Sequence, residues 1–244
     1  MESPSFIPHC DEQRFTACEY DRWLSRNSLS ARWVRFWFSP RRILWLNTPI
    51  STLPEAAGIS PSDRILDIGC GYGGVLLYLR RKLGGVPGGA SGWEGLDNSS
   101  LMVQRARKEI RQRGLEKDIR VTEGIATQLP YDDGSFDVIL CGYMVKHLSD
   151  GRLRDMIREA KRVMKPGGRL CVWEAIPSRF AFMNVWNLKL LRVGVSVIHM
   201  RTAKEIRVLL EEEGFVIQQP FGHGLYYFYP PLPRAGFIAV RPSF

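Results

Sequence analysis

Short apolar runs alternate with longer amphipathic stretches from residue 64 onward. The apolar runs predict strands at 64–68, 93–96, 119–122, 136–141, 169–174, 215–218 and 237–240. The stretches between them predict helices at 74–83, 100–113, 152–164 and 202–213, the last opened by a Thr202/Glu205 capping box. This alternation is typical of a doubly wound, Rossmann-like α/β fold with a seven-stranded sheet. Because no helix separates the last two strands, we expect an antiparallel strand at one sheet edge.

Two segments outside this alternation are predicted to cover the core domain, residues 59–244. Residues 1–58 predict an N-terminal helical cap, in which six arginines and no acid lie between residues 22 and 42, interleaved with Trp and Phe. The insertion 177–201 predicts a second lid, an amphipathic helix with a basic face that includes Lys189 and with a bend near Gly194. Both lids are expected to close over an apolar acceptor.

Composition excludes several classes of protein. The chain has 244 residues, 45% hydrophobic and 24% charged, which excludes disorder and fibrous repeats. Its five cysteines are dispersed without metal-ligand spacing, so we expect no metal and a reducing, cytoplasmic location. The net charge of +9, with the basic aromatic cap, suits contact with a membrane surface. Nucleic acid is disfavoured because no RNA-binding module is recognisable, and an oligomer is left open.

The most informative segment runs from a predicted strand through glycines into a helix, and it reads Asp67-Ile-Gly69-Cys-Gly71-Tyr-Gly73. Glycines at this place let the backbone turn tightly and approach a ligand closely. A dinucleotide pyrophosphate would be repelled by the carboxylate of Asp67, whereas an ammonium group would be attracted. S-adenosylmethionine carries such an ammonium group and no phosphate. The sequence here resembles the first motif of the class I S-adenosylmethionine-dependent methyltransferases.

The resemblance continues over residues 60–244, through Gly95-Leu-Asp97-Asn98, the segment 129–139 and Met164-Lys-Pro-Gly-Gly-Arg-Leu170. It implies that Asp97 holds the ribose hydroxyls, since a carboxylate accepts two hydrogen bonds, and that Asn98 lies along the adenine. The full set of cofactor residues that it implies is Asp67, Gly69, Cys70, Gly71, Tyr72, Gly73, Asp97, Asn98, Met102, Ile125, Ala126, Cys141 and Gly142. The chain departs from the family at Ile125, where an Asp usually meets the adenine amino group, and in a long loop at 84–92.

Catalytic candidates follow the fourth strand. Methyl transfer from a sulfonium is an in-line displacement, so the protein contributes mainly by positioning the reactants and excluding water. In related small-molecule enzymes the segment after this strand lines the active site, which makes His147 a candidate general base and Tyr143 a contact for the sulfur or the acceptor. The alternative interpretation of both residues is that they only pack or hydrogen-bond locally. Candidate acceptor-binding residues are Tyr20, Trp37, Glu174, Phe182, Trp186, His199, His223 and Tyr226.

The sequence therefore predicts an S-adenosylmethionine-dependent methyltransferase with S-adenosylhomocysteine as product. We expect it to act on a small, largely apolar or aromatic acceptor at oxygen, carbon or nitrogen, in quinone, lipid or secondary-metabolite biosynthesis. Two alternatives stay open. An RNA or protein methyltransferase is disfavoured because the Asn/Asp-Pro-Pro-Tyr/Phe type of motif is missing after the fourth strand. The sequence there reads Cys-Gly-Tyr-Met. A non-catalytic cofactor-binding scaffold is disfavoured by the intact Asp67, glycines and Asp97.

Overall fold

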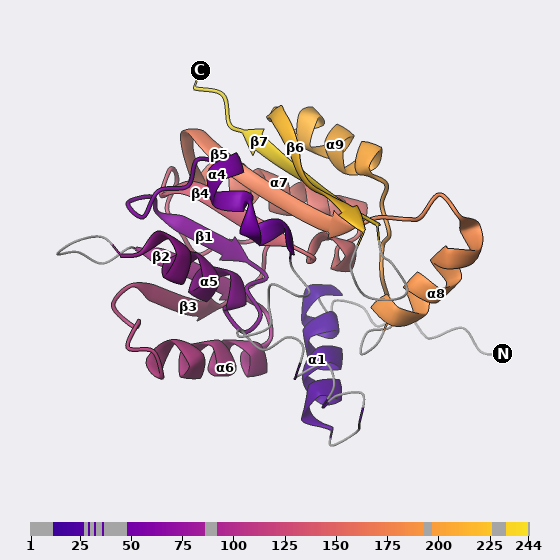
Figure 1. The fold of residues 1–244 in the computed structure, drawn as a ribbon, viewed down its shortest axis with the longest axis horizontal. Coiled ribbons are helices and arrows are strands. Elements are labelled where there is room, and N and C mark those ends of the chain that lie inside the picture. The colour runs from indigo at the N-terminus through magenta and orange to yellow at the C-terminus, as the bar shows by residue number, and fades with distance from the viewer. Residues whose placement is uncertain are drawn as a thin grey trace.

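The computed structural model describes residues 12–26, 29, 32, 36, 48–85, 92–192, 197–225 and 233–243. Its centre is a seven-stranded sheet in the order β3-β2-β1-β4-β5-β7-β6 (Figure 1). The strands are β1 Ile65–Ile68, β2 Trp93–Asp97, β3 Ile119–Glu123, β4 Phe136–Gly142, β5 Met164–Ala175, β6 Val216–Leu225 and β7 Pro233–Val240. The first five strands run parallel to one another, and β7 lies antiparallel between β5 and β6.

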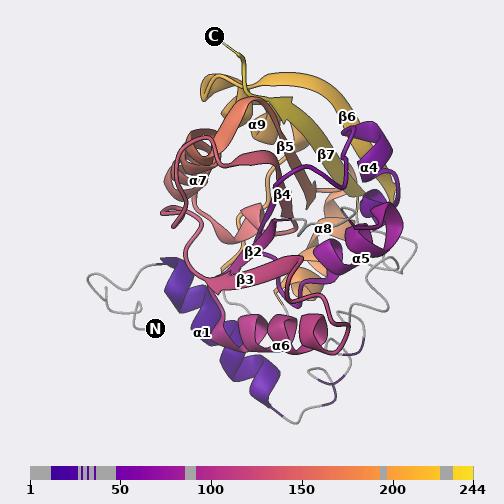
Figure 2. The same ribbon diagram turned by 90° about the vertical axis from the view of Figure 1, so that its left-hand side faces the viewer.

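Helices cover both faces of this sheet. The helices of the described chain are α1 Glu12–Ser25, α4 Leu53–Ala56, α5 Gly74–Leu83, α6 Ser100–Arg111, α7 Asp150–Val163, α8 Ala181–Leu191 and α9 Ala203–Glu212, with short 3-10 turns η1 Thr48–Ser51 and η2 Val145–His147. Helices α5 and α6 lie on one face, and α7 and α9 on the other (Figure 2). The sheet is therefore buried on both faces, as its continuous apolar strands predict.

The doubly wound fold is confirmed, and the strands and helices lie where the apolar pattern predicts them. The capping box is present, because the Thr202 hydroxyl accepts from the Glu205 N–H and the Glu205 carboxylate accepts from the Thr202 N–H. The antiparallel hairpin at the sheet edge is also confirmed. Three strands are at least four residues longer than predicted: β5 begins at Met164 and takes in the Lys-Pro-Gly-Gly motif, β6 continues to Leu225, and β7 begins at Pro233.

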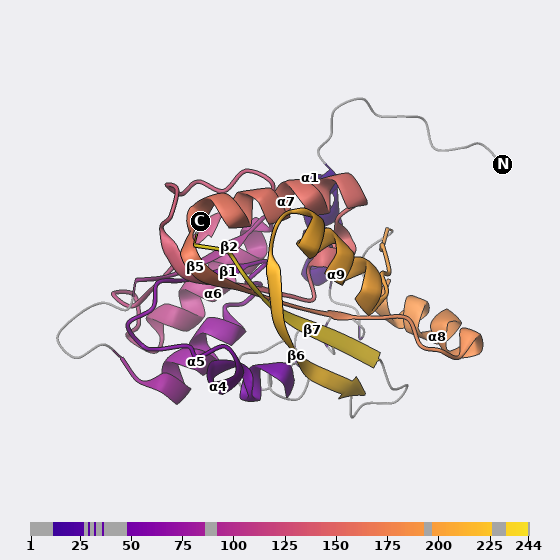
Figure 3. The same cartoon turned by 90° about the horizontal axis from the view of Figure 1, so that it is seen from above.

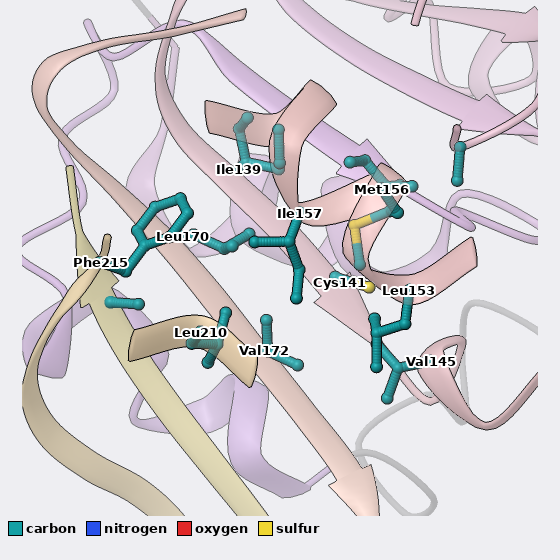
Figure 4. Packing of buried hydrophobic residues seen from close by; sticks show 14 of the residues in the cluster. Ile139, Cys141, Val145, Leu153, Met156, Ile157, Leu170, Val172, Leu210 and Phe215 are labelled. Atoms are coloured by element: carbon teal, nitrogen blue, oxygen red, sulfur yellow. The ribbon is translucent and has the colours of Figure 1, made fainter. Parts of the chain in front are cut away.

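The core beside α7 shows how the strands set the positions of the site segments. Side chains from β4 and β5 interlock with Met156 and Ile157 of α7 and with Leu210 of α9 (Figure 4). Cys141 lies inside this cluster next to Val145, the first residue of η2. The turn that follows β4 is thus anchored from beneath by close-packed side chains, which restrict its movement.

The two predicted lids are described in part. At the N-terminus, α1 ends at Ser25, and beyond Arg26 only Leu29, Arg32 and Phe36 of the cap up to residue 47 belong to the described chain, all three helical. The insertion forms α8, which ends at Leu191. Residues 197–200 are not helical, so the predicted basic helical face does not extend to His199, and the predicted bend near Gly194 lies outside the described residues. Within the described ranges, no helix is both long and apolar enough to cross a bilayer.

Candidate cofactor and acceptor site

The glycine loop that follows β1 is held against the end of β2. The N–H groups of Gly69 and Cys70 both donate to the carbonyl of Leu96, at 2.8 and 3.1 Å. Gly69 has a φ of +75°, and a Cβ there would lie 2.7 Å from Cγ of Met144. Only glycine combines this backbone conformation with the close approach of the segment after β4. The loop therefore brings the carboxyl ends of β1, β2 and β4 together.

Asp67 is buried beside this loop with a carboxylate oxygen that lacks a partner. Its exposed fraction is 2%, and Oδ2 accepts no hydrogen bond from the described residues. Burial, followed by the nearby charge of Asp97, raises the pKa of this carboxyl well above its usual range. A buried, unpaired carboxylate is costly unless a cationic or hydrogen-bond-donating group satisfies it. Asp67 is thus a fitting receptor for an ammonium group.

Asp97, at the end of β2, accepts hydrogen bonds at both carboxylate oxygens. Oδ2 accepts from the Gly71 N–H at 2.8 Å, and Oδ1 accepts from the Ser99 N–H at 3.0 Å. Ser99 in turn caps α6, because its hydroxyl accepts from the Met102 N–H at 3.0 Å. Burial raises the pKa of Asp97, and the backbone donors partly offset this increase. The glycine loop and the start of α6 are therefore organised around one carboxylate.

The remaining predicted cofactor residues surround this edge of the sheet with one exception. Tyr72 is buried under the guanidinium of Arg105, 5.4 Å from its ring centre. Ile125 pairs with Gln128 in a short bridge after β3, and Ala126 is buried. Cys141 differs, because its side chain is enclosed in the core beside α7. Only the backbone of Cys141 remains for the predicted cofactor contact.

Helix α1 lies against this site through two consecutive residues. The Tyr20 hydroxyl is 3.4 Å from Nε2 of His147, and the two rings meet edge to face with centres 5.5 Å apart. Next to it, the Ser99 hydroxyl donates to the carboxylate of Asp21. Burial, followed by the charges of Glu174 and Asp97, raises the pKa of the Tyr20 phenol and keeps it neutral. The helix thus connects the predicted base to the cap of α6.

A buried ion pair supports the turn between β4 and η2. Glu174, at the end of β5, is 1% exposed, and its Oε1 lies 3.3 Å from Nζ of Lys146. Oε2 accepts from the Lys146 N–H at 3.2 Å, and Oε1 also accepts from the Ala175 N–H at 2.8 Å. Lys146 Nζ donates further to the carbonyl of Tyr143, which has the left-handed φ of +55°. These contacts favour a positioning role for Glu174 over the predicted contact with the acceptor.

Sequence reasoning missed Lys146, although a signal for it was present. A carboxylate that ends a buried strand needs a cationic partner, and Lys146 lies in the apolar segment at the end of the adjacent strand. The backbone carbonyl of Lys146 accepts from the His199 N–H at 2.7 Å, which ties the end of the insertion to the same turn. His199 therefore lies near the site, as predicted, and its backbone makes this contact.

The imidazole of His147 is held in its neutral form. Burial lowers its pKa well below the usual range, and the positive charge of Lys146 and the neighbouring His199 lower it further. At neutral pH the ring is thus uncharged, with Nε2 next to the Tyr20 hydroxyl. Nδ1 has no hydrogen-bond partner within the described chain. A neutral imidazole with an acceptor nitrogen fits the chemistry of a general base.

Of the other predicted acceptor residues, Phe182 and Trp186 have described side chains. They lie on α8 and are 71% and 64% exposed, so contact of either with an acceptor stays a prediction. His223 lies in β6, but the position of its side chain is outside the described part of the structure, as are Trp37 and Tyr226 altogether. Their roles stay predictions.

Comparison with known proteins identifies the central segment. Residues 65–168 match the model of a family described as a methyltransferase domain. The chain is 33% identical over 171 residues to the 2-phytyl-1,4-beta-naphthoquinone methyltransferase of Arabidopsis thaliana, covering 68% of this chain and 61% of that protein. It is 34% identical over 116 residues to the demethylmenaquinone methyltransferase of Lactobacillus johnsonii, covering 48% of this chain and 45% of that protein. The chain thus spans about half of these two relatives.

Solved structures of methyltransferases have the same fold as this chain. A SAM-dependent methyltransferase from Aquifex aeolicus superposes with a TM-score of 0.62 at 21% identity, over 83% of this chain and 98% of that one. At this identity the likeness shows the fold alone. Together with the matched domain, the glycine loop between Asp67 and Asp97 supports the family that the motifs indicate. Residues 65–168 are therefore a methyltransferase domain by sequence, and the chain has the fold of a SAM-dependent methyltransferase.

Proposed function

We propose that this protein transfers the methyl group of S-adenosylmethionine to a small, largely apolar or aromatic acceptor in quinone, lipid or secondary-metabolite biosynthesis. The observation that carries the proposal is the arrangement of two carboxylates around one glycine loop. Asp67 has an unpaired buried oxygen for the ammonium of the methionine end, and Asp97 lies across the loop for the ribose hydroxyls. An aromatic acceptor is supported by the names of the two relatives, both methyltransferases of naphthoquinone-type compounds.

Bound S-adenosylmethionine would supply an activated methyl group on a sulfonium. The chain's own contribution is to hold the acceptor in line with that methyl and to exclude water. Asp67 and Asp97 would hold S-adenosylmethionine so that its methyl group could pass directly to the acceptor, with the sulfur as leaving group. A protonated acceptor loses one proton, and the neutral imidazole of His147 is the candidate base that takes it. Glu174 and Lys146 would keep the Tyr143–His147 turn in position for this step.

The test is a transfer assay with methyl-labelled S-adenosylmethionine and a reduced 1,4-naphthoquinone as acceptor. The wild-type chain is expected to label the acceptor. Asp97→Ala should lose the activity because ribose binding is removed, whereas the matched change Asp132→Ala, at an exposed acid after β3, should retain it. Labelled product from Asp97→Ala at the wild-type rate would contradict the proposal.

A further inference from the structure

Helix α8 carries its large apolar side chains on the side that faces solvent. Phe182, Val185 and Trp186 are 71%, 56% and 64% exposed, and Lys189 completes one helical face at the i, i+3, i+4, i+7 spacing. Asn187, on another side of the helix, is fully buried, and its amide nitrogen and oxygen have no hydrogen-bond partner in the described chain. A helix that packs on a protein core has the opposite arrangement.

The exposed face continues into the turn before α8. Phe180 is 46% exposed, with its ring centre 6.0 Å from that of Phe182. The guanidinium of Arg179 lies over the Phe180 ring at 4.7 Å, and the ammonium of Lys189 lies over the Trp186 ring at 5.5 Å. We call Arg179, Phe180, Phe182, Val185, Trp186 and Lys189 the outer α8 face. It combines aromatic side chains with cations at their rims.

Two hydrogen bonds within the chain orient this face. The Ser178 N–H donates to the Asn184 side-chain oxygen at 2.7 Å, and the Asn184 amide donates back to the Ser178 carbonyl at 2.9 Å. These two bonds fix the start of α8 while its outer face remains uncovered. The helix projects beyond the end of β5, at the same edge of the sheet as the candidate site (Figures 1 and 3). Exposed apolar patches of this kind mark interaction surfaces.

Charge decides which partner fits this face. Between Glu174 and Glu205 the chain has five Lys and Arg residues and no acid. A second copy related by a two-fold axis would bring the same cations against one another, which is unfavourable. An anionic lipid surface supplies the opposite charge to Arg179 and Lys189, and its interfacial region accepts Phe and Trp rings. The lipid surface is therefore complementary in both charge and polarity.

We propose that the outer α8 face docks on the surface of an anionic lipid bilayer. Docking buries the aromatic side chains at the headgroup boundary, while Lys189 and Arg179 keep their charged ends among the anionic headgroups. It places the carboxyl edge of the sheet next to the lipid, from which an apolar molecule could enter the site. This inference goes beyond the proposed methyl transfer, because a lipid-bound chain need not carry out that reaction.

The test is co-sedimentation of the full chain with vesicles of phosphatidylcholine containing phosphatidylglycerol, and with phosphatidylcholine alone. Wild type should bind the anionic vesicles, and added salt should weaken the binding. Phe182→Ser/Trp186→Ser should lower the partition coefficient at least about tenfold, and Lys189→Glu should lower it about fivefold or more. Val208→Ser on α9 and Arg111→Glu on α6 change exposed residues elsewhere and should have no effect.

A fluorescence measurement separates loss of docking from loss of fold. Trp186→Phe should retain vesicle binding and lose the blue shift that wild type shows when vesicles are added.

Absence of wild-type binding, or equal binding by the Phe182→Ser/Trp186→Ser variant, would overturn the proposal. A dimer in sedimentation that Trp186→Ser abolishes, without vesicle binding, would overturn it in favour of a second copy. Cofactor titration without vesicles tests the proposed function separately.

Discussion

The hydroxyl of Tyr20 lies 3.4 Å from Nε2 of His147, although the two residues are 127 positions apart in the chain. This contact places a side chain of the N-terminal helix against the candidate base. Because Asp21 beside it accepts a hydrogen bond from the Ser99 hydroxyl, α1 is attached both to η2 and to the start of α6. A phenol that donates to the neutral imidazole stabilises the uncharged form of the ring.

The first prediction concerns that phenol. Tyr20→Phe removes a hydrogen bond to neutral His147, so the pKa of the imidazole should rise toward its usual value. The free energy of unfolding should fall by about 0.5–1.5 kcal/mol. NMR titration of the His147 ring measures the first effect and urea unfolding the second. Tyr78→Phe, on the half-buried face of α5, is the matched control, and an unchanged His147 titration in Tyr20→Phe would contradict the account.

The buried pair of Glu174 and Lys146 gives a second prediction. Glu174→Gln leaves the Lys146 ammonium buried without its carboxylate, which should cost roughly 3–5 kcal/mol of folding stability. Lys146→Met alone should cost a similar amount because it leaves the carboxylate unpaired. The double variant should be more stable than either single variant, since both buried charges are removed. Urea unfolding of all four chains tests this coupling, and simple additivity of the two losses would argue against it.

Gly69 gives a third prediction because two separate constraints act on it. Ala at this position would adopt a left-handed φ, at about 1–2 kcal/mol, and would also overlap Met144, at about 1–3 kcal/mol more. Gly134→Ala isolates the first cost, because that residue has a φ of +61° and nothing within 4 Å of its Cβ position. Thermal unfolding should therefore show a clearly larger loss for Gly69→Ala. Equal losses would mean that the Met144 contact is not restrictive.

The burial of Asp67 predicts a dependence of stability on pH. Its pKa is raised in the folded chain, so protonation favours folding: the contribution is fully present below the unfolded pKa and is lost as pH rises through the folded pKa. Asp67→Asn removes this loss, so the unligated variant should gain stability relative to wild type as pH increases. Melting temperatures across acidic to neutral pH measure the difference. Asp132→Asn, at an exposed position, should show no such trend.

The apolar periodicity was sufficient to predict the fold, because the strands are short, continuous and buried on both faces. The resemblance to a family singled out Asp97 and the glycine loop, and the parallel strands explain why the two lie together, since the carboxyl ends of such strands meet at one edge. The Lys146–Glu174 pair was missed although each residue stands near the end of a buried strand, because the pairing itself depends on the register of β4 and β5. The outward face of α8 was missed for a related reason: a helix pattern does not tell which side another element covers.

The most direct test of the central claim is calorimetric titration of the purified chain with S-adenosylmethionine, with NAD as the control. The arrangement of Asp67, the glycine loop and Asp97 predicts saturable, one-site binding of S-adenosylmethionine and no binding of NAD. Asp97→Ala should weaken the binding at least about tenfold because it removes the charge-assisted hydrogen bonds to the ribose. Binding of NAD, or equal affinity of the Asp97→Ala variant for S-adenosylmethionine, would contradict the assignment of this site.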